Sequence, residues 1–290
     1  MSWRTLIIST RCKLDYKMGY MVVRGSETQR VYIDEIAILM IENPAVSLTG
    51  CLLEALTEKK IKVIFCDGKR SPMAELVPCH GSHNSSARIR EQVIWPEALK
   101  NEAWKAIIRE KILNQAKLLG KAGKERETGM LCDYAACIEP GDTTNREGHA
   151  AKVYFNALFG MKFTRGADTP INAALNYGYS IILSTFNREV VSCGYITQLG
   201  IFHDNMFNHF NLSCDLMEPF RGIVDNYVYE HQPEVFGADE KHEIWKLMHD
   251  HIEINYREQT VLNAIKIYCI HFFDAMRKQD LSEMVFPRIK

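Results

Sequence analysis

The 290-residue sequence lacks long apolar runs and any excess of charge of one sign, with a formal net charge of -1. No uninterrupted apolar stretch reaches the roughly 18 to 20 residues that a membrane-spanning helix needs. Residues 1–11 also lack the apolar region and small-residue cleavage site of a signal peptide. We therefore expect a soluble, cytoplasmic protein with no membrane partner.

The sequence also lacks a disulfide pattern. Its nine cysteines are odd in number, are spread along the chain, and include no Cys-x-x-Cys pair. This usage predicts reduced thiols, most of them small core residues. Cys66, Cys79, His80 and His83 lie near one another in the chain, but their spacing is not that of a zinc knuckle, so a zinc site is disfavoured.

A near-neutral chain carries no global signature of nucleic-acid binding, so any such function must come from local patches. Residues 234–253 are rich in acidic side chains, and an earlier stretch is basic. The basic set comprises Arg88, Arg90, Lys100, Lys105, Arg109, Lys111, Lys117, Lys121, Lys124 and Arg126. Glutamates are interleaved with these residues, so a solvated helix with surface ion pairs explains the pattern equally well.

The hydrophobic pattern predicts an α+β protein with two parts. Short β-type runs separated by turn signals cover residues 3–9, 20–24, 29–32, 37–42 and 62–66, with one helix near residues 48–56. Helical spacing then dominates, with helices expected across 104–119, 125–136, 147–158, 170–187, 215–229, 241–252 and 259–278. We expect a small N-terminal mixed β domain (1–70), a linker with a candidate last strand (71–84), and a larger all-α catalytic domain (85–290).

Glu147 opens a helix that is otherwise apolar on one face, and Tyr154 lies two turns further along the same face. A carboxylate at the edge of a buried stripe is costly unless a cation or a donor compensates it. The alternative is local, because Thr144-x-x-Glu147 fits a capping box in which the glutamate only reaches back to the cap N–H.

Two further segments carry polar side chains suited to chemistry. His203 follows a turn at Gly200, outside any clear periodicity, and Asp215 and Glu218 lie three residues apart at a helix start that Pro219 limits. Asp215 as a cap with Glu218 as its partner is the competing interpretation. Two carboxylates and one imidazole suit Mg²⁺ or Mn²⁺, which can activate a hydroxyl for attack on phosphorus. Spacing alone does not establish that the three side chains converge.

Four ordered motifs carry a resemblance to a known family. They are Arg146-Glu147-Gly148-x-Ala150-Ala151-x-x-Tyr154-Phe155, Asn172-Ala173-Ala174-Leu175-Asn176-Tyr177-Gly178-Tyr179, Leu199-Gly200-x-x-His203, and Asp215-Leu216-Met217-Glu218-Pro219-Phe220-Arg221. With these motifs the sequence resembles the CRISPR-associated adaptation integrase, the larger subunit of the complex that inserts new spacers. It most resembles the short form that accompanies type II systems, over nearly the whole chain.

The resemblance implies that Glu147, His203 and Glu218 bind the metal and are catalytic, and that Asp215 supports these ligands. In the family, the 3′-hydroxyl of a captured DNA fragment attacks a phosphodiester at the repeat boundary. Such a transesterification needs no external energy source, and the absence of a Gly-rich Walker loop from this sequence agrees with that.

The resemblance also implies partners: double-stranded DNA with 3′ ends, CRISPR repeat DNA, a homodimer, a small ferredoxin-like subunit and other type II adaptation proteins. Arg88, Arg90, Arg146 and Arg221 are candidates for phosphate contacts, with internal ion pairs as an equally weighted alternative. Tyr154 is a candidate for packing near a splayed nucleotide, but core packing is favoured, because aromatic side chains on a helical stripe usually lie in the core.

Two other functions fit the same residues. One is a non-catalytic nucleic-acid-binding scaffold whose acidic cluster is structural, and the other is a general repair nuclease acting on flaps or junctions. Residues 286–290 are too short to pack alone, so they are either frayed or docked on a partner.

Overall fold

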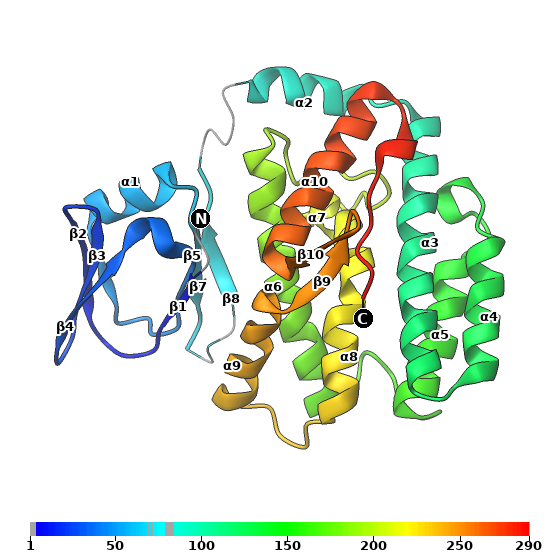
Figure 1. The fold of residues 1–290 in the computed structure, drawn as a ribbon, viewed down its shortest axis with the longest axis horizontal. Coiled ribbons are helices and arrows are strands. Elements are labelled where there is room, and N and C mark those ends of the chain that lie inside the picture. Colours follow the sequence, from blue (N-terminus) through cyan, green and yellow to red (C-terminus); the bar gives the residue numbers. More distant parts are fainter. Residues whose placement is uncertain (1–3, 69, 71, 79–83, 290) are drawn as a thin grey trace. The chain divides into compact units, whose positions relative to one another are not determined.

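The structure is a computed structural model that describes residues 4–68, 70, 72–78 and 84–289. The chain divides into two compact units, Met1–Gly81 and Ser82–Lys290. The first unit is built from mixed β-sheets and the second mainly from helices, as Figure 1 shows. This arrangement confirms the expected α+β class. The division falls inside the segment expected to be a linker.

Two four-stranded sheets form the N-terminal unit. The first has the order β1-β5-β7-β8, comprising β1 (Arg4–Ile8), β5 (Ile36–Ile41), β7 (Lys62–Cys66) and β8 (Pro72–Leu76). The second has the order β4-β3-β2-β6, comprising β4 (Thr28–Tyr32), β3 (Tyr20–Arg24), β2 (Lys13–Lys17) and β6 (Ser47–Leu48). Helix α1 (Gly50–Glu58) supplies Leu52 and Leu56 to the shared core. Strand β2 was not expected, because only Leu14 of its five residues is fully buried.

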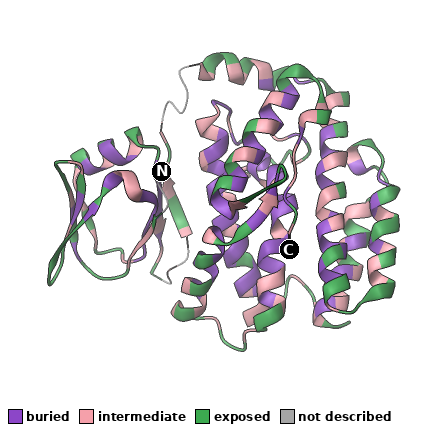
Figure 2. Cartoon of the chain, viewed as in Figure 1, coloured by how far each residue is buried: buried purple, intermediate pink, exposed green. Residues whose placement is uncertain are grey.

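Over its described residues, 84–289, the C-terminal unit is a helical bundle with one β-hairpin. Its helices are α2 (Ser85–Val93), α3 (Glu97–Lys121), α4 (Glu125–Ala136), α5 (Arg146–Phe159), α6 (Pro170–Ser192), α7 (Asn211–Leu216), α8 (Arg221–His231), α9 (Ala238–Lys246) and α10 (Val261–Lys278). The hairpin is β9 (His251–Ile254) with β10 (Arg257–Thr260). Buried residues line the inward faces of α6, α8 and α10 (Figure 2). Within the described ranges, no helix is long and apolar enough to cross a membrane.

Two expected helices are wrong in their limits. The helix expected at 215–229 is two helices, since α7 ends at Leu216, a 3₁₀ turn covers Glu218–Phe220, and α8 follows. The helix expected at 241–252 ends at Lys246, and β9 begins at His251. The alternation of buried Ile252 and Ile254 with more exposed neighbours has the period of a strand. Asn255 and Tyr256 close the hairpin with positive φ angles of 50° and 59°.

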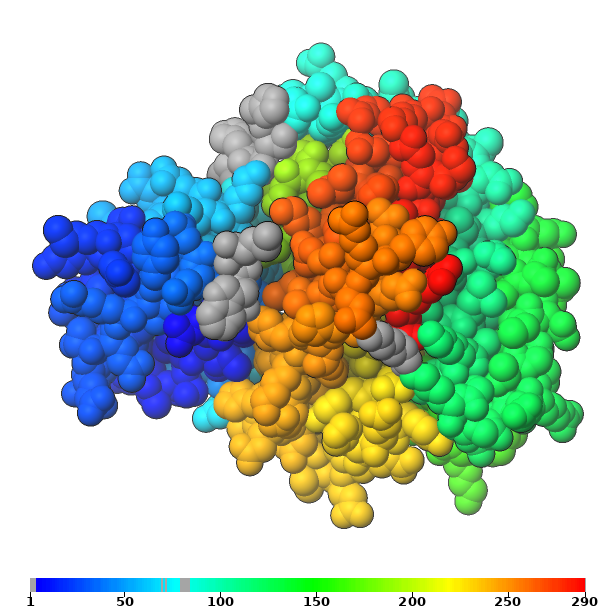
Figure 3. All heavy atoms as spheres, in the orientation of Figure 1, coloured from blue at the N-terminus to red at the C-terminus, as the bar shows by residue number. Residues whose placement is uncertain are grey.

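The C-terminal tail docks on its own helical unit. The backbone N–H of Arg288 donates to the carbonyl of Glu253 (2.8 Å), and the side-chain amide of Asn114 donates to the carbonyl of Pro287 (3.2 Å). In the space-filling view the tail (red) lies between the hairpin (orange) and α3 (Figure 3). The tail is therefore ordered against this chain, which neither expected alternative, fraying or docking on a partner, describes.

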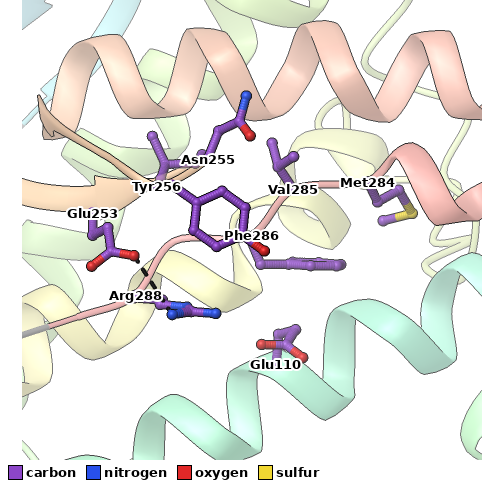
Figure 4. A pocket seen from close by; sticks show the side chains of 9 residues that line it. Glu110, Glu253, Asn255, Tyr256, Met284, Val285, Phe286 and Arg288 are labelled. Atoms are coloured by element: carbon purple, nitrogen blue, oxygen red, sulfur yellow. Dashed lines mark ion pairs between the residues drawn. The ribbon is translucent and has the colours of Figure 1, made fainter.

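The tail, the hairpin and α3 enclose a hollow of about 230 Å³. It is lined by Glu110, Glu253, Ile254, Asn255, Tyr256, Met284, Val285, Phe286 and Arg288 (Figure 4). Burial raises the pKa of Glu110, although the charges of Arg109 and Arg288 oppose the rise. None of Glu147, His203 and Glu218 lines this hollow.

Candidate functional site

Glu147 lies in the first turn of α5, but it does not cap that helix. The cap is Asn145, whose side-chain oxygen accepts from the N–H of Gly148 (3.2 Å). The carboxylate of Asp142 accepts from the N–H groups of Arg146 (2.8 Å) and Glu147 (3.0 Å). Because other side chains satisfy these donors, the capping box proposed from Thr144 and Glu147 is wrong. The Glu147 carboxylate is left for another partner.

That partner is Lys111 of α3, a helix that runs beside α5 and α8 (Figure 1). Its Nζ lies 2.5 Å from Oε1 of Glu147 and 2.6 Å from Oε2 of Glu218. Burial alone would lower the pKa of Lys111, but the charges of Glu218 and Glu147 outweigh it, so the pKa is raised. Two of the predicted site residues therefore converge on a single ammonium group, which the sequence had placed only within a basic stretch.

Glu218 opens the 3₁₀ turn between α7 and α8, and its side chain is only 3% exposed. Oε1 pairs with the guanidinium of Arg221 (2.9 Å), and Oε2 pairs with the ammonium group of Lys111 (2.6 Å). Burial would raise the pKa of Glu218, but the charges of Arg221 and Lys111 outweigh it and the pKa is lowered. The site thus holds a buried, ionised carboxylate whose two oxygens each meet a cationic side chain.

Asp215 is fully buried in α7 and organises the loop that carries His203. Its carboxylate accepts from the backbone N–H groups of Ile201 (2.7 Å), Phe202 (3.1 Å) and His203 (3.1 Å), and Oδ1 lies 2.5 Å from Nδ1 of His203. With Nδ1 engaged in this way, the neutral imidazole presents Nε2 as its free ring nitrogen. Asp215 is not a helix cap, because α7 begins four residues earlier at Asn211.

The imidazole of His203 lies within electrostatic reach of both glutamates. The hydrogen bond with Asp215 is the main cause that raises the pKa of His203, burial opposes it, and the charges of Asp215, Glu218 and Glu147 add to the rise. The side chain is 40% exposed, so one edge of the ring is accessible. Next to it, Phe202 stacks on Trp104 with ring centroids 4.3 Å apart.

Gly200 makes this loop conformation feasible. A Cβ atom at position 200 would lie 2.3 Å from the carbonyl oxygen of His203 and 2.7 Å from Oδ2 of Asp215. The Asp215 carboxylate cannot retreat without breaking the hydrogen bonds that hold the loop. The glycine noted in the sequence therefore serves close packing around the Asp215 carboxylate.

Behind the glutamates lies a buried polar cluster that the sequence did not reveal. The Asp225 carboxylate accepts hydrogen bonds from the hydroxyls of Tyr154 (2.9 Å) and Tyr179. Burial raises the pKa of Asp225 to about 6, although both hydrogen bonds and the charge of Arg221 oppose the rise. The guanidinium of Arg221 also lies over the ring of Tyr179, 4.7 Å from its centroid.

This cluster decides between the two interpretations of Tyr154. The side chain is 0% exposed and its hydroxyl is engaged by Asp225, so it presents no surface to a nucleotide. The core-packing alternative describes its position, and a DNA contact would require α5 to separate from α8. The spacing of apolar residues on α5 already favoured a core position, whereas no local signal indicated the partner.

The four arginines expected at phosphates differ in their surroundings. Arg88 pairs with Glu91 (3.0 Å), and Arg221 pairs with Glu218. Arg90 is exposed on α2. Arg146 lies 5.9 Å from the centroid of the Tyr134 ring, and its buried Nε has no hydrogen-bond partner among the described residues. Internal ion pairs therefore account for two of the four.

The donor chemistry fits a divalent cation, although in this structure Lys111 lies between the carboxylates. Across the described residues, no group of three His, Cys, Asp or Glu side chains is assembled as a metal centre. The carboxylates of Glu147 and Glu218 nevertheless converge on one cationic position, and carboxylate oxygens are ligands that Mg²⁺ and Mn²⁺ prefer. The disfavoured zinc ligands Cys79, His80 and His83 lie outside the described residues.

Comparisons with known proteins cover almost the whole chain. The family described as CRISPR associated protein Cas1 matches residues 6–232. The chain is 32% identical over 296 residues to the CRISPR-associated endonuclease Cas1 of Neisseria meningitidis serogroup C (strain 8013), covering 100% of this chain and 97% of that relative.

Solved structures share the fold. A casposase bound to integration product matches with a TM-score of 0.77 and 16% identity, covering 96% of this chain and 92% of that one. A chain of a partial Cas6-RT-Cas1–Cas2 complex matches with a TM-score of 0.67 and 16% identity, covering 100% of both.

We predict that Gly200→Ala destabilises the helical unit, because the new methyl group would collide with the His203 carbonyl and Asp215. The expected cost is about 2 kcal/mol or more, as for other strained close contacts. Thermal melting measures it. Gly129→Ala in α4 is the control, since a Cβ there meets nothing within 4 Å and alanine favours helix. Equal melting temperatures for the wild type and Gly200→Ala would contradict the prediction.

We predict that Asp225→Asn weakens the dependence of stability on pH. The folded protein binds this proton more tightly than the unfolded chain, because the pKa rises from 3.8 to about 6. Protonation of Asp225 therefore stabilises the folded protein. This stabilisation is complete below about pH 4 and is lost as pH rises through about 6. Its size is on the order of 3 kcal/mol.

Urea unfolding followed by tryptophan fluorescence at several pH values tests this, with the exposed Asp274→Asn as control. The wild type and the control should lose more stability than Asp225→Asn between about pH 4 and pH 7. Parallel pH profiles for all three proteins would show that the buried carboxyl group does not titrate as described.

Proposed function

Because the chain belongs to the Cas1 family of CRISPR-associated proteins, we propose that it is a metal-dependent DNA endonuclease and integrase. It inserts captured DNA fragments into a CRISPR array as new spacers. The observation that carries this proposal is the convergence of Glu147 and Glu218 on one cationic position, with His203 beside them. The fold shared with a casposase bound to integration product supports it.

In this proposal Glu147, Glu218 and His203 would hold Mg²⁺ or Mn²⁺, the imidazole through Nε2, because Asp215 engages Nδ1. A bound ion of this kind lowers the pKa of a hydroxyl and neutralises charge that develops at phosphorus. The lowered pKa of Glu218 keeps its carboxylate ionised for this role.

The reaction is a transesterification at phosphorus. The 3′-hydroxyl of the captured fragment forms a new P–O bond, and the P–O bond to the 3′-oxygen of the array strand breaks. One phosphodiester replaces another, so no nucleotide cofactor is required. The proton of the attacking hydroxyl passes to solvent, and the departing 3′-oxygen takes up a proton from solvent in turn.

Phosphates of the DNA backbone would be bound by arginines around the site. Arg90 is exposed, and Arg146 adjoins Glu147 in the first turn of α5. Arg88 and Arg221 complete the proposed set by exchanging a carboxylate partner for a phosphate. A near-neutral protein can bind DNA in this manner, because only a local cationic surface is needed.

We infer that the working assembly is cytoplasmic and contains a homodimer of this chain, the small ferredoxin-like CRISPR-associated subunit, and fragment and repeat DNA. Other type II adaptation proteins would supply the substrate. The full-length likeness to a chain from a Cas6-RT-Cas1–Cas2 complex supports a Cas protein partner.

We predict that Glu147→Gln and His203→Ala each lower strand joining on branched DNA in Mg²⁺ or Mn²⁺ by about 100-fold or more, because each removes a metal ligand. Denaturing gels of labelled strands measure the products. Glu243→Gln, which removes half of an exposed ion pair on α9, should behave as the wild type. Undiminished joining by either variant would favour the non-catalytic scaffold.

Addition of the small partner subunit separates an integrase from a general repair nuclease. We predict that the pair inserts a fragment with free 3′-hydroxyl ends into a plasmid that carries a repeat, and that blocking those ends abolishes insertion. Sequencing of the junctions gives the site of insertion. Cleavage of flaps or junctions without repeat-directed insertion would instead indicate a repair nuclease.

A further inference from the structure

Lys111 has an unusual position for a lysine, because its ammonium group is buried between two side chains proposed to bind metal. Its side chain is 11% exposed, and Nζ approaches Glu147 at 2.5 Å and Glu218 at 2.6 Å. Lysine is rarely buried unless it is paired. Here it is paired twice, with carboxylates from α5 and from the turn before α8.

We propose that Lys111 is an internal counter-ion that takes the cation position between Glu147 and Glu218 in the metal-free protein, and that a divalent ion binds only by displacing it. This inference rests on the metal site proposed above. Lys111 is not itself a metal ligand. In one state its ammonium group lies between the two carboxylates, and in the other a divalent ion takes that position.

The need for a counter-ion follows from burial. The side chains of Glu147 and Glu218 are 26% and 3% exposed, and two carboxylates brought together there without a cation would repel each other. Of the two glutamates, Arg221 pairs with Glu218, through Oε1. Lys111 contacts both carboxylates and so joins α5 to the turn before α8.

Mutual exclusion follows from distance and charge. An ion bound at roughly 2.0 to 2.2 Å from both glutamate oxygens would lie in the gap that Nζ now fills. The ammonium and a divalent ion would then repel each other at short range in a buried site. Both cannot hold the same pair of oxygens, so loading the site requires Nζ to leave.

The displacement must be a motion of the side chain. Three residues further along α3, the amide of Asn114 donates to the carbonyl of Pro219 (3.0 Å) and to that of Pro287 (3.2 Å). These bonds hold α3 against the turn that carries Glu218. The backbone of Lys111 therefore stays in place, and its flexible four-carbon stem provides the movement.

The competition has a measurable consequence. When a site is competent for only part of the time, its apparent affinity is reduced by that fraction. Lys111→Met retains most of the apolar stem but removes the charge. It should therefore bind metal more tightly than the wild type, and its metal-free form should be less stable because the two carboxylates lose their shared cation.

The test uses the purified full-length chain, titrated with Mn²⁺ alone in a calorimeter and melted in EDTA or in Mn²⁺. Lys111→Met should bind Mn²⁺ at least about tenfold more tightly than the wild type. Its melting temperature should fall in EDTA and rise more in Mn²⁺ than that of the wild type. Lys117→Met, an exposed lysine on the same helix, should match the wild type in both measurements.

Lys111→Arg keeps the positive charge. It provides a second test if Lys111→Met does not fold without metal. It should melt as the wild type in EDTA and show no gain in Mn²⁺ affinity. Equal or weaker Mn²⁺ binding by Lys111→Met, or a gain in affinity shared by Lys111→Arg, would overturn the proposal. In either case, the proposed metal site would still be supported if the wild type binds Mn²⁺ and Glu147→Gln does not. If Glu147→Gln binds Mn²⁺ as well as the wild type does, both the proposed metal site and the counter-ion proposal are overturned.

Discussion

A single buried ammonium group connects the segments of the helical unit that carry two of the candidate site residues. Lys111 of α3 holds Glu147 at the start of α5 and Glu218 in the turn before α8. Because opposite charges in a buried site interact strongly, this contact stabilises the relative positions of three segments that are distant in the chain. The same contact offsets part of the negative charge that Glu147 and Glu218 bring together.

His203 is positioned by a buried carboxylate rather than by Lys111. Asp215 accepts three backbone N–H groups from residues 201–203 and also engages Nδ1 of His203. One buried carboxylate thus sets both the path of the loop and the orientation of the ring. Gly200 permits this close approach, and the exposed edge of the imidazole remains available to a ligand.

Hydrogen bonds that involve the C-terminal tail also hold the segments that carry these residues. Asn114 joins the carbonyl after Glu218 to the tail at Pro287, while Arg288 extends the hairpin through Glu253. On the other side, Asp225 ties Tyr154 of α5 to Tyr179 of α6. The glutamates therefore sit on elements that are fixed by hydrogen bonds from several directions, as a site that must hold precise geometry requires.

The sequence alone determined the α+β class and most helices, and it singled out Glu147, His203, Asp215 and Glu218 as candidates, because helical periodicity and short motifs are local properties. It could not identify Lys111, whose contact with Glu147 spans 36 positions, since one lysine in a basic stretch resembles another. The hairpin and the docked tail were missed for the same reason, because their partners are chosen by packing. Only the tertiary structure decided which charges face each other, since a helical pattern specifies the face of a residue but not what lies opposite it.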